Sequence, residues 1–301
     1  MSQKSLIRSC TIYILVALGS VVFFSLTLKS LGIVPTILLG CLVIGLSTVL
    51  SQGGHYRRGG RNIAKSMAET LLESEHILEL VEPKQFPWLD YAFYERVTQE
   101  MQALGLSAIA DIEDCTISQS APNQRFFFRV FVHSQGEIAA ICSHLRIRGF
   151  NGWLAKWMGG VQTDIKLIEF SSTYSDGGVV DTSNAKDAPT FDQPDWRSQR
   201  RLPADTAIAH QYEVHQKHLT EYQQHHPNAE VVKISNYTGF YRLYQDELRR
   251  SSEWRKNRGG SGITAEEVKR IAGPKLQDTA HNVVQAMEEE GLLGKNQEED
   301  Y

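Results

Sequence analysis

Carboxylates and histidines in the middle of the chain are the residues that could do chemistry. Asp111, Glu113 and Asp114 lie close together and could supply paired carboxylates for general acid–base catalysis. Four further polar residues lie on predicted strands and could meet on one sheet to bind a ligand: His133, His144, Asp164 and Glu169. None of these residues has a spacing that is diagnostic of a reaction, so the sequence leaves the catalytic residues unassigned.

No motif in the sequence fixes a reaction or a cofactor. The chain contains no GxSxG nucleophile elbow, no GxxxxGK(S/T) phosphate loop, no HExxH zinc site and no GxGxxG that follows a strand. Catalytic residues can lie far apart in sequence, so this absence disfavours an enzyme without excluding one. We expect no cofactor.

A histidine-rich segment lies on a helix predicted from about Pro203 to Gln224. His215 falls on the apolar stripe of this helix, and His218 follows one turn later. Zinc normally needs ~3 to 4 protein ligands, and no cysteine or carboxylate lies at a companion spacing. We therefore expect no metal site, and we expect His215 to be a hydrogen-bonded core residue.

The four cysteines are too few and too scattered for a disulfide framework or a CxxC metal site. Cys10 and Cys41 belong to apolar runs at the start of the chain, which leaves Cys115 and Cys142 in the polar remainder. This usage is typical of a reducing compartment, where both would be buried thiols.

Two tryptophans, Trp153 and Trp157, lie in a glycine-bounded segment that runs from Gly149 to Gly160. The composition has three interpretations, of which a short helix closing one end of the core is the simplest. The segment could instead contact the bilayer interface, where Trp and Lys are favoured, or form a flap over a ligand on the sheet. The flap interpretation places both tryptophans in one ligand site with the four polar residues named above.

Hydrophobic periodicity predicts the elements that position these residues. Helical spacing predicts an amphipathic helix between Asn62 and Glu82 and a second helix from Pro87 to Leu104, which Gly105 ends. Alternating patterns then predict five strands, at residues 112–118, 125–133, 138–147, 164–174 and 179–183. Glycine-containing turns join several of them as hairpins. We therefore expect an α+β fold with an antiparallel β-meander of about five strands packed by helices.

The region after the sheet is predicted to be mainly helical. A turn-rich linker at residues 187–195 precedes the histidine-rich helix. A further helix, from Thr238 to about Arg258, becomes basic toward its end. Because acidic residues lie on the same helix, we interpret this end as solvated rather than as a nucleic-acid site.

The last part of the chain is predicted to be a short acidic tail of two helices. A Gly-rich hinge begins at Gly259, and Thr264 and Glu267 then have the spacing of a capping box. Ile263 and Val268 can pack on each other as a hydrophobic staple at the same helix start. We expect this tail to contact a protein partner.

The start of the chain carries the clearest signal. Two apolar runs, residues 10–28 and 31–50, contain no charged side chain and have Lys29 between them. Each run is near the ~20 residues that cross a bilayer as a helix, which predicts a transmembrane hairpin. A cleaved signal peptide fits less well because the first run is too long, whereas a re-entrant second segment stays open as an alternative.

Basic residues flank the outer ends of both runs, while the turn between them holds only Lys29. The positive-inside bias then predicts that both termini and the polar domain are cytoplasmic, in an integral protein of a bacterial inner membrane. Four basic residues after the second run would contact anionic lipid headgroups: Arg57, Arg58, Arg61 and Lys65.

These observations divide the chain into four parts. They are a transmembrane helical hairpin (1–51), a basic juxtamembrane segment with an amphipathic helix (52–83), an α+β cytoplasmic domain (84–258) and a Gly-rich hinge with an acidic two-helix tail (259–301). The net charge of −4 argues against nucleic acid as a partner, whereas a second copy of the chain is a candidate partner for the juxtamembrane helix.

Two functional hypotheses remain. The leading one is a membrane-anchored cytoplasmic binding or scaffolding module. The alternative is an enzyme or sensor for a small or lipidic ligand, bound at the sheet face under Trp153 and Trp157.

Overall fold

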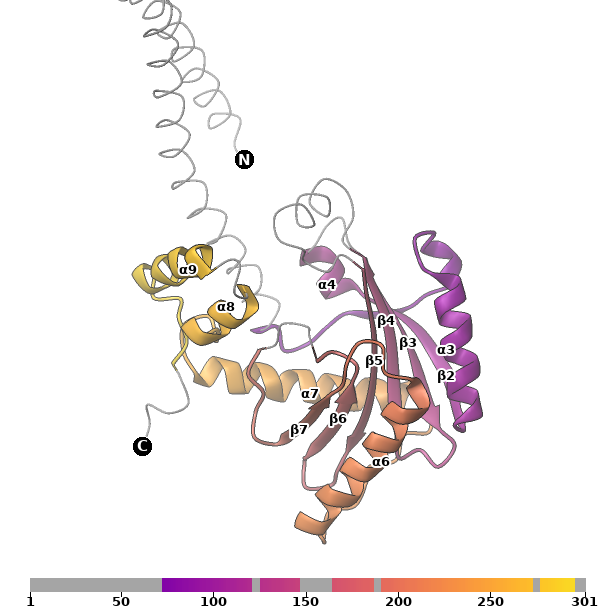
Figure 1. Ribbon diagram of the computed structural model, residues 1–301. Coiled ribbons are helices and arrows are strands. Elements are labelled where there is room, and N and C mark those ends of the chain that lie inside the picture. Colours follow the sequence, from indigo (N-terminus) through magenta and orange to yellow (C-terminus); the bar gives the residue numbers. More distant parts are fainter. Residues whose placement is uncertain (1–71, 121–124, 147–163, 187–190, 273–276, 296–301) are drawn as a thin grey trace, which may run out of the picture. The chain divides into compact units, whose positions relative to one another are not determined.

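The computed structural model describes residues 72–120, 125–146, 164–186, 191–272 and 277–295, which form an α+β fold around one mixed sheet (Figure 1). Both apolar runs lie outside the described residues, as do Arg57, Arg58, Arg61, Lys65, Trp153 and Trp157. Within the described ranges, no helix combines the length and the apolar character needed to cross a bilayer.

Seven strands form the sheet in the described part of the chain, and their spatial order equals their order in the sequence. They are β1 (Leu78–Leu80), β2 (Leu106–Asp114), β3 (Phe126–His133), β4 (Ala139–Arg146), β5 (Asp164–Thr173), β6 (Val179–Ser183) and β7 (Arg197–Arg201). Strands β1 to β6 pair antiparallel, and β7 joins the edge parallel to β6. The predicted antiparallel meander is confirmed for β2 to β6, while β1 and β7 extend it into a mixed sheet.

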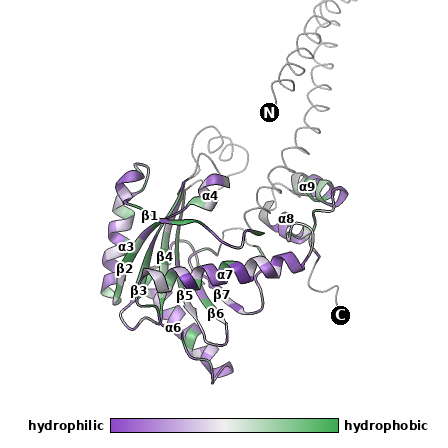
Figure 2. Ribbon diagram, turned by 180° about the vertical axis from the view of Figure 1, so that it is seen from behind, coloured by the Kyte–Doolittle hydropathy of each residue, from purple (hydrophilic) through white to green (hydrophobic). Residues whose placement is uncertain are grey.

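Helices pack on both faces of this sheet. The helices α3 (Tyr91–Ala103) and α6 (Ile208–His225) cover one face, and α7 (Tyr237–Asn257) lies across the other (Figure 2). The shorter helices are the 3-10 helix η1 (Pro83–Gln85), α4 (Cys115–Ser120), α8 (Ala265–Ala272) and α9 (Gln277–Glu289).

The alternation of side chains along β3 explains why both faces need helices. Phe127 and Phe131 join the core under α3 and α6, whereas Phe128 and Val130 join the core under α7. All four side chains are almost fully buried. Successive residues of a strand point to opposite faces of the sheet. Because β3 has apolar side chains on both faces, each face must be covered by helices.

The helix predicted between Asn62 and Glu82 does not reach Glu82. Residues Leu78–Leu80 instead form edge strand β1, which pairs with residues 112–114 of β2. Hydrogen bonding to the sheet therefore outweighs the helical spacing of the apolar residues in this segment. Pro83 follows after Val81 and Glu82 and cannot donate a backbone hydrogen bond, which disfavours a helix through this point.

The strand predicted over residues 112–118 starts earlier and ends earlier than expected. It begins at Leu106, directly after Gly105, whose φ of 81° ends α3 as predicted. It stops at Asp114 because the Asp114 carboxylate accepts a hydrogen bond from the Ile117 backbone at 3.0 Å and so starts helix α4.

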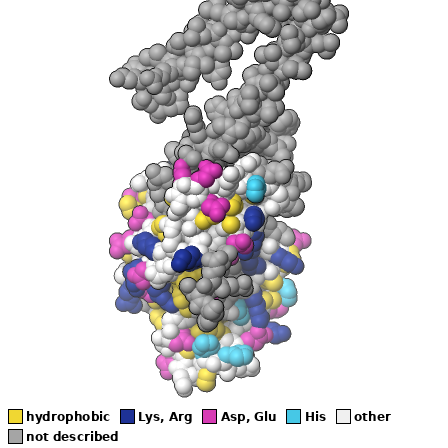
Figure 3. All heavy atoms as spheres, turned by 90° about the vertical axis from the view of Figure 1, so that its left-hand side faces the viewer, with side chains coloured by type: hydrophobic (Ala, Val, Ile, Leu, Met, Phe, Trp, Pro, Cys, Tyr) yellow, Lys and Arg dark blue, Asp and Glu magenta, His cyan; other side chains and the backbone are white. Residues whose placement is uncertain are grey.

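Charged side chains of both signs lie interspersed on the surface of the described domain. On the face seen in Figure 3, Lys and Arg side chains lie among Asp and Glu side chains rather than in one continuous patch. Many are paired, for example Arg249 with Asp246 and Glu253. This arrangement offers a nucleic-acid backbone no continuous basic surface on that face.

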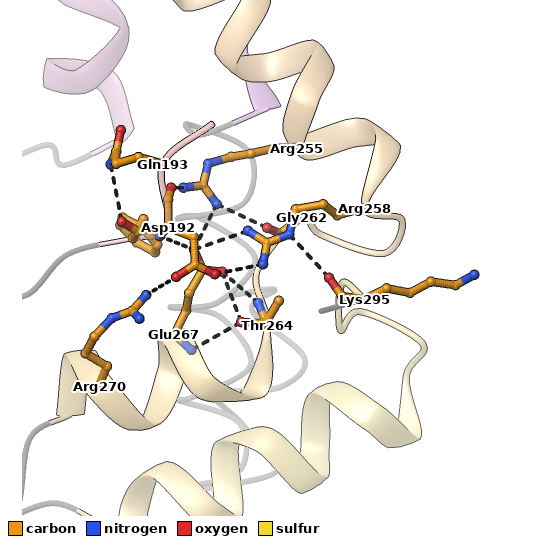
Figure 4. Close-up of polar contacts among 10 residues, drawn as sticks. Asp192, Gln193, Arg255, Arg258, Gly262, Thr264, Glu267, Arg270 and Lys295 are labelled. Atoms are coloured by element: carbon orange, nitrogen blue, oxygen red, sulfur yellow. Dashed lines mark hydrogen bonds and ion pairs between the residues drawn. The ribbon is translucent and has the colours of Figure 1, made fainter. Parts of the chain in front are cut away.

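Glu267 forms the centre of a buried ion-pair network that connects α7, α8 and the segment before β7 (Figure 4). The predicted capping box is confirmed, since Thr264 N donates to Glu267 Oε2 at 2.8 Å and Glu267 N donates to Thr264 Oγ1 at 3.2 Å. The other carboxylate oxygen of Glu267 accepts from Asp192 N at 2.7 Å and from Arg255 Nη1 at 3.3 Å. Ile263 and Val268 lie in one apolar cluster, as the staple requires.

The basic end of α7 is not solvated, contrary to the sequence interpretation. Arg255 and Arg258 are only 5% and 7% exposed. Arg258 Nη2 donates to Asp192 at 2.8 Å and Arg255 Nη2 donates to the Asp192 carbonyl oxygen at 3.0 Å. Acidic groups from distant positions in the sequence neutralise this helix end, and periodicity along the helix does not contain that information.

The network predicts that Glu267 holds α8 in place. Glu267→Ala should destabilise α8 by about 3 to 5 kcal/mol, because it removes the capping box and the carboxylate that accepts from the buried Arg255 guanidinium. Amide hydrogen exchange over residues 264–272 of the full-length chain measures this as a loss of protection. The control is Glu266→Ala at the neighbouring exposed residue, and equal protection in the two variants would contradict the role of the network.

Candidate ligand-binding site

A cavity of about 240 Å³ lies between α7 and the sheet. Alternate residues of strands β3, β4 and β5, whose side chains share one face of the sheet, line the floor of the cavity, and α7 forms its roof. The apolar part of the lining includes Phe128, Ile141, Leu167, Phe240, Leu243 and Leu248. Because β-strand side chains alternate, these floor residues are the ones that the sequence directs away from α3 and α6.

The polar end of the cavity is formed by Glu169 on β5, Arg197 on β7 and Glu247 on α7. Arg197 Nη1 donates to Glu247 at 2.6 Å, and Arg197 Nη2 donates to Glu169 at 3.4 Å. Arg197 Nε donates to Asp181 of β6, which is completely buried. The side chains of Glu169 and Glu247 are each 21% exposed. Three carboxylates from three elements thus surround one guanidinium.

The negative charges outnumber the positive charge, and this shifts the proton affinity of the site. Burial, followed by the negative charge of Asp181, raises the pKa of Glu169 to about 8, although Arg197 acts in the opposite direction. Burial also raises the pKa of Glu247, against the effect of Arg197. The bond from Arg197 is shorter to Glu247 than to Glu169, so we assign the proton held near neutral pH to Glu169.

Asp181 leaves an acceptor unused beside this cluster. One carboxylate oxygen pairs with Arg197, while Oδ1 is buried and has no hydrogen-bond partner among the described residues. Asp181 pairs with Ser171 in the sheet register, and Ser171 lines the cavity, so Asp181 faces the α7 side of the sheet. A buried acceptor of this kind is costly unless a donor satisfies it.

Of the six ligand-site residues predicted from the sequence, the structure places Glu169 in this cavity. His144 lies on the opposite face, where its ring contacts those of Trp88 and Phe93 at centroid distances of 6.4 and 6.3 Å. His133 ends β3 and lies 6.3 Å from the ring of Tyr212 on α6. The structure therefore does not bring either histidine together with Glu169.

Asp164 begins β5 and pairs with Arg146 in the sheet register, far along the strand from Glu169. Trp153 and Trp157 lie outside the described residues, so their place relative to the cavity stays a prediction.

Sequence reasoning missed Asp181, Arg197 and Glu247. Glu247 did carry a signal, because it lies seven residues after Phe240 and three after Tyr244, on the stripe that faces the sheet. An acidic residue on an apolar stripe indicates a buried charge with a partner. Arg197 carried no signal, since β7 consists wholly of polar residues.

The polar group around His215 on the other face is part of the core. His215 is completely buried, and its ring bonds to Ser172 at 3.2 Å and to Thr182 at 3.1 Å. Burial, assisted by the nearby His218, lowers the pKa of His215 to about 3, which keeps the ring neutral. The prediction of a hydrogen-bonded core histidine is confirmed. In the described ranges, no group of His, Cys, Asp and Glu residues has the arrangement of a metal site.

The thiols fit the same division between core and surface. Cys142 is buried on the α3 face, and burial raises its thiol pKa above the ordinary value. Cys115 is half-buried at the start of α4. Neither thiol is positioned as an activated nucleophile.

No family model matches the chain, and neither a curated protein nor a solved structure is significantly similar to it.

The raised pKa of Glu169 predicts a pH dependence of stability. The folded protein holds a proton on Glu169 between its ordinary pKa near 4.5 and about 8, whereas the unfolded chain releases it. The folded state thus binds more protons in this window, and the free energy of unfolding should fall as pH rises through it. Glu169→Gln, which mimics the protonated group, should remove this contribution.

Urea unfolding of the full-length chain at pH 5, 6.5 and 8 tests the effect, since the stability of the wild type relative to Glu169→Gln should decrease across the series. The control is Glu213→Gln on α6, whose side chain is 72% exposed. Parallel pH profiles for wild type and Glu169→Gln would show that Glu169 titrates normally.

Proposed function

We propose that this chain is a membrane-anchored module whose α+β domain binds a small, partly apolar molecule in the cavity under α7. The supporting observation is the composition of the cavity, which has an apolar wall at one end and charged groups at the other. Small-molecule sites combine these two features, because apolar surface supplies affinity and a few polar groups fix orientation.

The size of the cavity limits the ligand. A volume of about 240 Å³ lies below the usual range of roughly 300 to 1,000 Å³ for drug-sized ligands. It exceeds the roughly 150 Å³ of an engineered cavity that binds benzene. A small metabolite with one ring or a short alkyl chain fits between these limits.

The charged end supports binding rather than a purely structural role. A structural ion pair is best satisfied when opposite charges balance, yet Arg197 faces three carboxylates. The side chains of Glu169 and Glu247 also keep some exposure, so a ligand has access to them. Of the two hypotheses raised by the sequence, the cavity favours the one in which the sheet face binds a small ligand.

The membrane anchor is supported by the sequence alone. The apolar runs at residues 10–28 and 31–50 have the length of two spans, and Arg57, Arg58, Arg61 and Lys65 follow the second. In this proposal the domain is cytoplasmic and senses its ligand close to the bilayer. The acidic tail after Gly259 remains the proposed contact for a protein partner that would read out binding.

Filling the cavity tests ligand binding. Ser171 lines the cavity floor, so Ser171→Leu should occupy space that the ligand needs and weaken its binding by about tenfold or more. A panel of small metabolites with amine, hydroxyl and carboxylate heads is screened against the full-length chain in detergent micelles by thermal stabilisation, and hits are titrated against wild type and Ser171→Leu.

The matched control is Ser107→Leu on β2, where the serine is exposed and does not line the cavity. It should bind hits as the wild type does. The proposal fails if no compound stabilises the wild type, or if hits bind Ser171→Leu with unchanged affinity.

The proposed topology predicts where the domain is accessible. Protease added outside intact bacterial cells should leave the domain uncut, whereas the same protease added to opened cells should degrade it. A reporter fused after Tyr301 should be active only as a cytoplasmic protein. Cleavage from outside would contradict the proposed orientation. Recovery of the chain in the soluble fraction would contradict the proposed membrane anchor.

A further inference from the structure

We propose that the ligand of the cavity carries a protonated amine, which binds between Glu169 and Glu247 while its apolar part lies against Phe240 and Leu243. This inference rests on the proposed function, because it names the chemical class of the ligand in the same cavity.

The hydrogen bonds of Arg197 leave carboxylate oxygens available. Each of its three nitrogens pairs with a different carboxylate, and both glutamates use Oε1 for that bond. Among the described residues, Oε2 of Glu169 and Oε2 of Glu247 take no part in these bonds to Arg197, and the buried Asp181 Oδ1 has no hydrogen-bond partner. An ammonium group has three donors and no acceptor, which is the complement of this set.

The sign of the charge selects against other head groups. With all four side chains ionised, the cluster of Asp181, Glu169, Glu247 and Arg197 carries an excess of negative charge. The three guanidinium nitrogens of Arg197 already bond to carboxylates, so an anionic head group would meet Glu169 and Glu247 in the cavity lining without a further donor from Arg197. A neutral hydroxyl could bond to one oxygen but would leave the excess charge uncompensated.

A metal ion is a poorer occupant than an amine. In the described part of the chain, these carboxylates do not form a group with metal-site geometry. The Arg197 guanidinium lies between Glu169, Asp181 and Glu247, where it would repel a divalent ion held by the same oxygens. An amine instead needs only hydrogen-bond acceptors, which Glu169 and Glu247 supply in the cavity lining.

Binding of a cation should release the proton that Glu169 holds. The charged groups that face Glu169 are Asp181 on β6, Arg197 and Arg201 on β7 and Glu247 on α7. A further positive charge among them favours the ionised carboxylate. Affinity for an amine should therefore rise with pH from about 6 to 8, where the amine is still protonated because its pKa is about 10.

The test uses sets of three probes that share an apolar group and differ in the head. One set is phenethylamine, 2-phenylethanol and 3-phenylpropanoate, and parallel sets carry butyl and cyclohexyl groups. Isothermal titration of the full-length chain at pH 6 and pH 8 gives the affinity of each probe. The amine should bind about tenfold more tightly than the alcohol at pH 8, with the carboxylate weakest.

Glu169→Gln identifies the residue responsible. This variant should lose about tenfold in affinity for the amine at pH 8, lose much less in affinity for the alcohol, and lose the pH dependence of amine binding. Titration in buffers of different ionisation enthalpy should show proton release for the wild type and none for the variant. Glu213→Gln, at the exposed α6 position, is the control for a change of charge alone.

The outcomes separate the inference from the function on which it rests. If alcohols or carboxylates bind as tightly as amines, or if Glu169→Gln keeps the amine preference, the amine assignment is overturned while the binding function stands. Stabilisation by magnesium or calcium in place of the amines overturns it in the same way. If no head group in any set binds, both the inference and the proposed function fail.

Discussion

The burial of a single guanidinium among three carboxylates is the constraint on which one half of this domain depends. Arg197 is the first residue of β7, and its bonds reach β5, β6 and α7. Since a largely buried charge without compensation costs several kcal/mol, the parallel edge strand and the middle of α7, at Glu247, are fixed relative to the sheet by the same residue. The arrangement over-compensates Arg197, and the cavity takes its negative character from that excess.

Because side chains alternate between the two faces of the sheet, this charged region is kept apart from the core under α3 and α6. Under α3 and α6 the buried His215 is neutral and bonds to Ser172 and Thr182. Under α7 the floor residues leave a cavity and an ionised cluster. The same strand β5 supplies Ser172 to the first face and Glu169 to the second. Alternate residues of one strand therefore serve packing on one face and ligand chemistry on the other.

The sequence predicted the features that depend on local pattern. The capping box of Thr264 and Glu267, the stop at Gly105 and the meander from β2 to β6 each require only a few neighbouring residues. Strand β7 was missed because its five residues are polar, without alternation, and pair with β6 across a long connection. The candidate site was predicted only at Glu169, since Asp181, Arg197 and Glu247 acquire their roles through contacts far apart in the sequence.

An anionic membrane surface and the α7 cavity would both attract a cationic ligand, because both carry negative charge. A bilayer surface that carries anionic lipids has a potential near −30 mV, which enriches a monovalent cation at the surface by about threefold. This enrichment decays within a Debye length of about 8 Å at physiological salt, so a soluble domain would not benefit from it. The proposed anchor, with two spans followed in the sequence by the basic residues Arg57 and Arg58, would tether the domain to such a surface. The carboxylates of the α7 cavity would then draw an amine from a surface where amines are already concentrated.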